Sequence, residues 1–262
     1  MDIIQLKGLD ELKEMPKEGR KAYAKWQTEV FDARYKGCIA SSVKLSKIYS
    51  GNTQFPPLRK GTPDIEVIDT DTVSALFDAR LHNQSVCVLN FASYNYPGGG
   101  FVNGAMAQEE ALCYTSTLYN VLSHFQSYYE WNREHKNRGI QDDRAIYSPE
   151  VIFFHNGECR TASVLTCAAP KRNLLLRYNA FTEEENTQAL ISRILFMRKI
   201  CDSNPCDVLI LGAWGCGVFK QNPEVIAQLF RAGFTDAPVK KVIYAIPGGL
   251  NLEVFRKVIV TK

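Results

Sequence analysis

The sequence predicts an α/β fold, with a mixed and mainly parallel sheet that carries helices on both faces. Short apolar runs of strand length alternate along the chain with longer segments of helical periodicity, which is typical of this fold class. The run from Asp207 to Ala213, DVLILGA, is nearly all apolar, as expected for a strand covered on both faces. Glycine-rich loops follow two of the expected strands, which is where such folds bind their ligands.

In the first half of the chain, apolar periodicity and breaker residues define the expected elements. Ala22, Trp26 and Val30 give residues 17–36 one apolar side, whereas glycine and proline interrupt regular structure before residue 63. The elements expected here are a helix over 17–36, an irregular segment over 37–63, a strand over 65–68, a helix capped by Asp71 that runs to about Leu81, a strand over 86–90, and helices over 108–124 and 128–137.

In the second half, β-branched and aromatic residues indicate strands, and capping residues indicate where helices begin. After a polar linker at 141–143, the elements expected are strands over 148–154 and 162–168, a helix from Thr182 to about Ile200, a strand over 207–213, a helix that Asn222 and Pro223 begin and that runs to about Ala232, a strand over 241–246, and a helix over 251–260. No low-complexity linker divides the chain. We therefore expect one domain over residues 1–262, with residues 1–60 packed on its core as an N-terminal helical extension.

Composition argues against several classes of function. The net charge of +3 gives no electrostatic case for binding nucleic acid or membranes, and no apolar run reaches the length of a membrane span. The N-terminal segment lacks the apolar core of a secretory signal. The eight cysteines include no Cys-x-x-Cys pair, and the four histidines show no metal-ligand spacing. We expect a cytoplasmic protein with reduced thiols, no metal and no cofactor.

The segment from Pro97 to Glu110, PGGGFVNGAMAQEE, is the strongest candidate for a functional site. Three consecutive glycines are costly to order, so such a run suggests backbone that a ligand approaches closely. Gln108, Glu109 and Glu110 then begin an otherwise apolar helix. On spacing alone, an ordinary loop followed by acidic residues in the first turn of a helix explains the segment equally well.

A second glycine-rich loop, LGAWGCGVF at residues 211–219, lies between an expected strand and the helix that begins at Pro223. Gly215 and Gly217 would leave backbone N–H groups free to face phosphate oxygens near the start of that helix. A tight turn without a ligand remains an equal alternative. The loop lacks the Gly-Lys-Ser/Thr ending of a Walker motif and the spacing of a dinucleotide fingerprint.

Together, the two loops resemble a known family. The run NFASYNYPGGGFVNGAMAQEEALCYTSTLY is similar to the signature of the poly(ADP-ribose) glycohydrolases, in which Gln-Glu-Glu follows three glycines after six to eight residues; here the gap is residues 101–107. The downstream loop resembles the bacterial-type branch. The resemblance implies a macrodomain core, a three-layer α/β/α sandwich with a mixed central sheet that binds ADP-ribose. One departure is Lys171, which follows Pro170 where the family pattern has asparagine.

The resemblance also implies an activity, the hydrolysis of the ribose–ribose O-glycosidic bond of ADP-ribose polymers, and a role for each matching residue. Glu110 would be the general acid and base, Glu109 would hold the ribose and the catalytic geometry, and Gln108 would support the loop. The other residues implied are Gly98, Gly99 and Gly100 beneath the diphosphate and terminal ribose, Gly215, Cys216, Gly217 and Val218 as donors to the diphosphate, Phe219 against the terminal ribose, Asn103 as a sugar contact, and Asn90, which either orients the loop or only caps its strand.

The chemistry of the two glutamates favours a single catalytic carboxyl group. Glycoside cleavage commonly uses two carboxylates on opposite sides of the scissile bond. Adjacent helix residues point about 100° apart, so Glu109 and Glu110 are poorly placed to flank a sugar in that way. One carboxylic acid that protonates the leaving oxygen and then activates water fits better.

Three functions remain open from the sequence. The first is a polymer glycohydrolase, the second a hydrolase of mono-ADP-ribosylated protein or another ADP-ribose conjugate, and the third a non-catalytic ADP-ribose-binding module. Two intact glutamates argue against the third. The expected partners are ADP-ribose polymer or ADP-ribosylated protein, with no direct nucleic acid and no membrane, and we expect a monomer.

Overall fold

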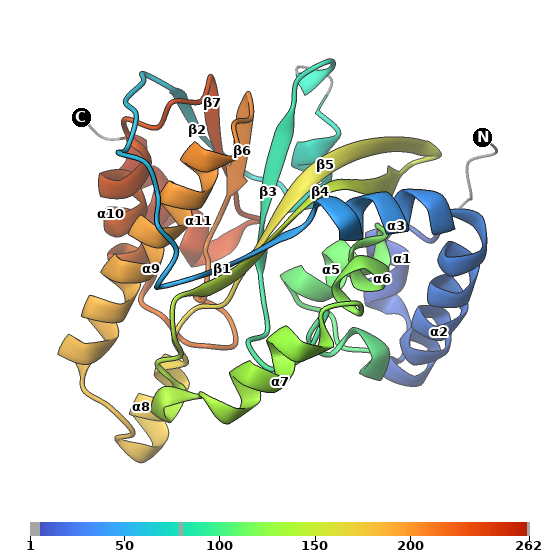
Figure 1. The fold of residues 1–262 in the computed structure, drawn as a ribbon, viewed down its shortest axis with the longest axis horizontal. Helices are drawn as coiled ribbons and strands as arrows, with labels where there is room; N and C mark the ends of the chain where they lie inside the picture. The colour runs from blue at the N-terminus through green and yellow to red at the C-terminus, as the bar shows by residue number, and fades with distance from the viewer. Residues whose placement is uncertain (1–5, 79–80, 261–262) are drawn as a thin grey trace.

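A seven-stranded mixed sheet forms the centre of the computed structural model, which describes residues 6–78 and 81–260. Its order is β1-β4-β5-β3-β6-β7-β2 (Figure 1). The strands are β1 (Lys47–Ser50), β2 (Asp64–Ile68), β3 (Val86–Phe91), β4 (Arg144–His155), β5 (Glu158–Cys167), β6 (Val208–Leu211) and β7 (Lys241–Ala245). Strands β5, β3, β6, β7 and β2 pair in parallel, whereas β4 pairs antiparallel with both β1 and β5. The expected mixed sheet is therefore confirmed.

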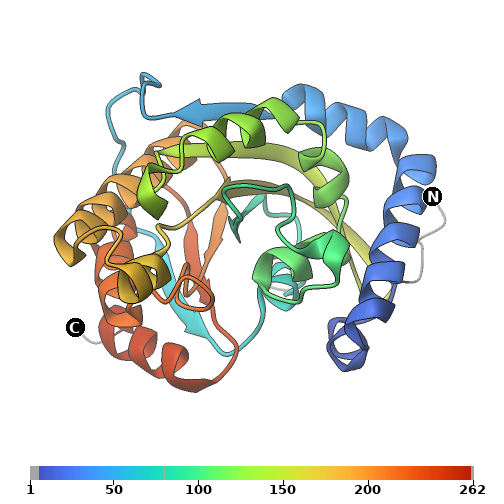
Figure 2. The same cartoon turned by 90° about the horizontal axis from the view of Figure 1, so that it is seen from below.

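Helices cover both faces of this sheet (Figures 1 and 2). They are α1 (Leu9–Glu14), α2 (Lys17–Arg34), α3 (Lys36–Leu45), α4 (Thr72–Leu76), α5 (Gln108–Tyr114), α6 (Leu118–Leu122), α7 (Gln126–Glu134), α8 (Arg172–Tyr178), α9 (Glu183–Ser203), α10 (Pro223–Phe234) and α11 (Gly249–Phe255), with 3₁₀ turns η2 (Phe101–Asn103) and η3 (Asn137–Gly139) and a final π turn η4 (Arg256–Val260). Alternate side chains of β3 point to opposite faces of the sheet. Cys87 packs with α9 and α10 on one face, and Val88 packs with α4 and α5 on the other. The three-layer arrangement expected from the sequence is confirmed.

The prediction of an irregular segment over residues 37–63 is wrong for its first part. Helix α3 and strand β1 lie there, and β1 pairs with β4 at the edge of the sheet, with Lys47 opposite Tyr147. A four-residue strand of this kind is defined by its partner rather than by its own pattern. The N-terminal extension therefore contains a strand as well as helices, and its residues 1–5 lie outside the described range.

The prediction of one helix over residues 108–124 is also wrong, because the chain breaks between α5 and α6. The hydroxyl of Thr115 donates to Ala111 O at 2.8 Å and that of Ser116 to Leu112 O at 2.6 Å, while Thr117 N leaves the helix to donate to Ile152 O of β4 at 3.0 Å. These side-chain and strand contacts replace the helical hydrogen bonds.

Several element limits differ from the prediction. Asp71 does cap α4, since its carboxylate accepts from Val73 N at 2.9 Å and Ser74 N at 3.0 Å, but the helix ends at Leu76 rather than Leu81. Residues 79–80 of the expected helix lie outside the described range. Helix α7 begins two residues early and ends at Glu134, and α11 begins at Gly249. Strands β4 (Arg144–His155) and β5 (Glu158–Cys167) are longer than predicted, and β6 (Val208–Leu211) is shorter. Helices α1 and α8 had no predicted counterpart.

We propose that residues 1–60 do not form an independent unit. Arg20 Nε donates to Gly104 O at 2.8 Å and Gln27 Nε2 to Cys113 O at 2.9 Å, so α2 is tied to the loop and helix around residue 110. We expect limited proteolysis to yield no folded fragment that lacks residues 1–60, because cleavage there would also remove β1 from the sheet. Recovery of such a fragment that is folded by circular dichroism and still binds ADP-ribose by calorimetry would contradict this.

The two glycine-rich loops lie at the same end of the sheet, beyond the carboxyl ends of its parallel strands. The carboxyl ends of the parallel strands meet there, so the segments after β2, β3, β5, β6 and β7 lie together. Both glycine-rich loops follow strands of this set, β3 and β6. No helix in residues 6–78 and 81–260 combines the length and apolarity needed to cross a membrane.

Candidate active site

Glu110 lies in the first turn of α5 and is only 6% exposed. Both of its carboxylate oxygens accept backbone hydrogen bonds. Gly100 N donates to Oε1 at 2.7 Å, and Ala107 N donates to Oε2 at 2.8 Å. These bonds fix the carboxyl group between the end of the triple-glycine loop and the start of its own helix. Each oxygen keeps a second lone pair that a reacting group can use.

Glu109 is more deeply held. It is 4% exposed, its Oε2 accepts from Ser93 N at 2.6 Å, and its Oε1 accepts from Asn90 Nδ2 at 3.2 Å. Burial raises the pKa of Glu109 to about 8; the nearby Glu110 carboxylate adds to the rise and the bond from Ser93 opposes it. Burial therefore favours the protonated form of Glu109 more than it would be favoured in an exposed glutamate.

The triple-glycine loop wraps around these two carboxyl groups. Gly99 has φ +59°, and a Cβ atom placed on it would stand 2.6 Å from Glu110 Oε1 and 2.7 Å from Glu109 Oε2. The two glutamates thus converge on one point of the loop, although they are neighbours in the helix. A glycine is needed at Gly99 because the protein's own carboxyl oxygens occupy the space of a side chain, in addition to any approach of a ligand.

Gln108 and Asn90 connect the carboxyl groups to the end of β3. Gln108 Oε1 accepts from Phe91 N at 2.8 Å and its Nε2 donates to Leu89 O at 2.9 Å. The sequence left two roles open for Asn90, orienting the loop or capping its strand. In the structure, its Nδ2 donates to Glu109 and, at 3.3 Å, to Thr166 Oγ1. Asn103 lies apart from this network, exposed at the end of η2.

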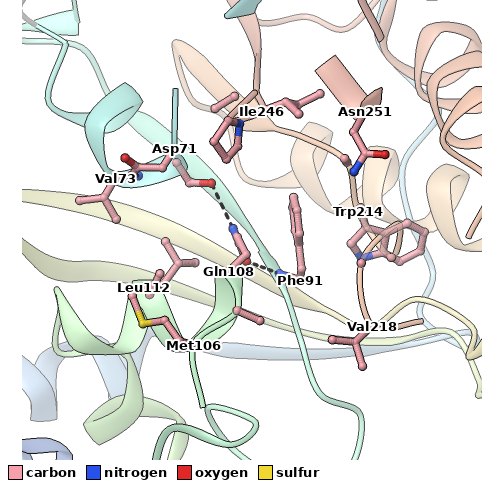
Figure 3. Close-up of a pocket in the computed structure, with 18 of the residues that line it drawn as sticks. Asp71, Val73, Phe91, Met106, Gln108, Leu112, Trp214, Val218, Ile246 and Asn251 are labelled. Atoms are coloured by element: carbon pink, nitrogen blue, oxygen red, sulfur yellow. Dashed lines mark hydrogen bonds between the residues drawn. The ribbon is translucent and has the colours of Figure 1, made fainter. Parts of the chain in front are cut away.

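A cavity of about 500 Å³ adjoins this network. Figure 3 shows side chains of α4, α5, the 211–219 loop and the segment after β7 directed into it. Among the residues expected at the site, those that line it are Gln108, Gly215, Gly217, Val218 and Phe219, while Glu109, Glu110, Asn90, Gly98, Gly99, Gly100, Asn103 and Cys216 do not. The lining residues that the sequence did not indicate include Asp71, Thr72, Phe91, Ile246 and Asn251.

The 211–219 loop presents backbone to this cavity. Trp214, fully buried, anchors it through a bond from Nε1 to Cys167 O at 2.9 Å. Gly215 has φ +76° and packs so closely that a Cβ atom would come within 2.8 Å of Ala169 Cβ. Gly217 is different, since no atom lies within 4 Å of the place where its Cβ would stand. Cys216 is half-buried, and burial raises its pKa to about 12, so this thiol stays protonated.

Proton transfer is the chemistry that these groups support. In the described part of the chain, no group of three or more histidine, cysteine, aspartate or glutamate side chains is arranged to hold a metal ion. Two buried carboxyl groups beside a cavity of this size can serve a substrate as proton donor, proton acceptor or hydrogen-bond partner.

Known proteins resemble this chain in sequence and in fold. The sequence model of the microbial-type PARG catalytic domain matches residues 16–156, more than half of the chain. The fold is similar to that of poly(ADP-ribose) glycohydrolase (PARG) from Thermomonospora curvata, with 28% identity and a TM-score of 0.82 over 92% of this chain and 99% of that one. A Thermomonospora structure bound to the inhibitor ADP-HPD matches over the same shares with 27% identity and a TM-score of 0.79. PARG from Deinococcus radiodurans in complex with ADP-ribose matches with 26% identity and a TM-score of 0.74, over 85% of this chain and 96% of that one. No curated protein matches the chain.

Proposed function

The chain belongs to the family of microbial-type PARG catalytic domains, and from this premise we propose that it releases ADP-ribose from ADP-ribose polymers with Glu110 as general acid and base. Its activity is that of a poly(ADP-ribose) glycohydrolase. The observation that carries the catalytic assignment is the position of Glu110, buried next to the cavity and fixed by two backbone donors on the loop and the helix.

In the proposed mechanism, Glu110 protonates the leaving ribose oxygen as the glycosidic bond breaks. The same carboxylate then takes a proton from the water that attacks the anomeric carbon, which returns Glu110 to its starting state. Gly100 N and Ala107 N hold the group in place throughout, because each oxygen has a lone pair to spare. Burial excludes bulk water from the proton transfer.

The proposed ligand lies along the cavity. Its diphosphate faces the backbone of Gly215 to Val218, and its terminal ribose lies between the triple-glycine loop and Phe219. The adenosine then extends toward Thr72, Ile246 and Asn251, which line the cavity and belong to neither loop. A cavity of about 500 Å³ is of the size that nucleotide-like ligands occupy.

The test of this function is incubation with polymer of defined length and, separately, with mono-ADP-ribosylated protein. We expect ADP-ribose to appear from the polymer. Release only from the mono-ADP-ribosylated protein would favour the second hydrolase activity. Binding of ADP-ribose without release from either substrate would favour a binding module.

Replacement of Gly217 tests whether the 211–219 loop binds the diphosphate. Valine fits the protein at this exposed position, since nothing lies within 4 Å of the new Cβ, but it would stand between backbone donors and phosphate oxygens. We expect Gly217→Val to bind ADP-ribose about ten- to a hundredfold more weakly, the cost of one or two lost charge-assisted hydrogen bonds. Its thermal midpoint should match that of the wild type.

Gly37→Val provides the control, because Gly37 is an equally open and exposed position on α3. Calorimetry with ADP-ribose should show no change for this variant. An unchanged affinity of Gly217→Val would remove the 211–219 loop from the proposed site.

We also propose that the enzyme works as a monomer inside the cell. Glu109 and Glu110 are held by hydrogen bonds from residues of the same chain, which supports a site that works without a second copy. All eight cysteines are free thiols, which suits a reducing compartment. Gel filtration with light scattering tests the first point, and localisation of the tagged protein tests the second.

A further inference from the structure

Lys171 occupies an unusual position beside the cavity. Its Nζ lies 5.7 Å from the ring centroid of Phe219, which lines the cavity, so its charge is held over an aromatic face at the cavity's edge. Its backbone N donates to Gly139 O at 2.8 Å, which ties it to the segment that contains Lys136. In sequence, Lys171 follows Pro170, where the family resemblance leads us to expect asparagine.

Lys171 forms no ion pair within the part of the chain that the structure describes. Among the described residues, no carboxylate forms an ion pair or hydrogen bond with Lys171 or Lys136, whereas the neighbouring Arg172 and Arg138 pair with Glu183 and Glu185. Burial, with a contribution from Lys136, lowers the pKa of Lys171. A half-buried cation next to another cation, with its own charge unbalanced, is a position that a bound anion would stabilise.

Both loops of the proposed site adjoin this pair of lysines. On one side, Asn132 Nδ2 donates to Tyr94 O at 2.8 Å and Arg133 to Asn95 O at 3.0 Å, which joins the end of α7 to the segment leading into the triple glycine. On the other side, Asn173 N donates to Phe219 O at 3.0 Å, which joins α8 to the 211–219 loop. The lysines therefore lie where these two loops approach each other.

We propose that Lys171 and Lys136 bind a phosphate of the second ADP-ribose unit of the polymer, the unit that departs when Glu110 acts. This inference rests on the proposed function. The terminal ribose lies between the same two loops, so the leaving unit must extend outward past Phe219 and Lys171. That unit carries its own diphosphate, whereas the proposed function assigns the diphosphate of the terminal unit to the 211–219 loop, in which Cys216 N is already bonded to Ala213 O. A second anion is thus brought to a part of this rim where Lys171 and Lys136 form no ion pair with any described residue.

The test compares two ligands in the Glu110→Gln background, in which polymer persists. Binding of ADP-ribose and of a short defined polymer is measured by fluorescence anisotropy at low and high salt. We expect Lys171→Met to weaken polymer binding about three- to tenfold at low salt, less at high salt, and to leave ADP-ribose binding unchanged. Lys136→Met should weaken polymer binding less, because Lys136 is exposed.

Two variants complete the design. Lys171→Arg keeps the charge and should retain most of the polymer affinity, and Lys44→Met removes an exposed charge from α3, far from α8 in both views (Figures 1 and 2), and should change nothing. If Lys171→Met weakens the binding of ADP-ribose and of polymer equally, Lys171 contacts the terminal unit instead. If it weakens neither, Lys171 does not bind a phosphate. Both results overturn the proposal. Failure of the proposed function would appear separately, as absence of polymer turnover by the wild type.

Discussion

Glu110→Gln is expected to reduce the release of ADP-ribose from polymer by about 10²-fold or more. A general acid contributes about 10²–10⁴ in rate, and here the same group also activates water. A loss of 10²-fold corresponds to about 3 kcal/mol of barrier. Glutamine keeps the size of the side chain but cannot cycle a proton. ADP-ribose affinity should change much less, because the two glycine-rich loops supply most of the proposed contacts.

The hydrogen bonds of Glu110 require a control for stability. Glutamine has one acceptor oxygen, so Gly100 N or Ala107 N loses its partner in the variant. We expect a cost of about 1–3 kcal/mol in the free energy of unfolding, which chemical denaturation measures. Turnover is therefore compared at a temperature at which the variant is fully folded.

Glu109→Gln separates the roles of the two glutamates. The pKa of Glu109, raised to about 8 by burial, makes it a second proton carrier next to the cavity. Its carboxyl group is nevertheless bound to Asn90 and Ser93, so we expect this variant to lose substrate positioning as well as rate. A larger loss of turnover in Glu109→Gln than in Glu110→Gln would make Glu109 the general acid and Glu110 the positioning residue. Near-native turnover of Glu110→Gln, or loss of its binding and turnover together, would refute Glu110 as the acid.

Most of the fold was predictable because its central elements have local signals. Strands β2, β3 and β7 agree with the prediction to within one residue at each end, and α10 begins at the expected Pro223. Strand β1 was not predictable in the same way, since its four residues become a strand only through pairing with β4. The break after α5 also depends on a distant partner, the carbonyl of Ile152. Contacts across long sequence separations decide such cases.

The candidate site was predictable only in part, from its two glycine-rich loops. The triple glycine and Gln-Glu-Glu carry a pattern, and Glu109 and Glu110 lie together at the start of α5. The opposite wall comes from the ends of β2 and β7, where Ile246 N donates to Ile68 O at 3.1 Å and Gly248 N to Asp69 Oδ1 at 2.8 Å. No motif indicates those residues, because their place at the cavity results from parallel pairing in the sheet.

Gly99→Ala is the second change for which a large effect is expected. The new methyl group would stand 2.6 Å from Glu110 Oε1 and 2.7 Å from Glu109 Oε2, closer than real contacts allow. Because both carboxyl groups are buried and held by backbone donors, one of them must move by a few tenths of an ångström or more. Misplacement of a catalytic group by about 1 Å can cost about 10²-fold in rate. We therefore expect turnover of polymer to fall by up to about 10²-fold.

Gly157→Ala isolates the backbone part of this effect. Gly157 has φ +79°, comparable to the +59° of Gly99, but no atom lies within 4 Å of its Cβ position, and it lies in the exposed turn between β4 and β5. Both alanines should therefore cost about 1–2 kcal/mol of unfolding free energy from left-handed backbone. Only Gly99→Ala should also lose activity, because only there does the methyl group meet the carboxyl oxygens. If Gly99→Ala retains wild-type turnover while Gly157→Ala shows the expected loss of stability, the position of Glu110 does not depend on the triple-glycine loop, and the catalytic geometry proposed for this enzyme is wrong.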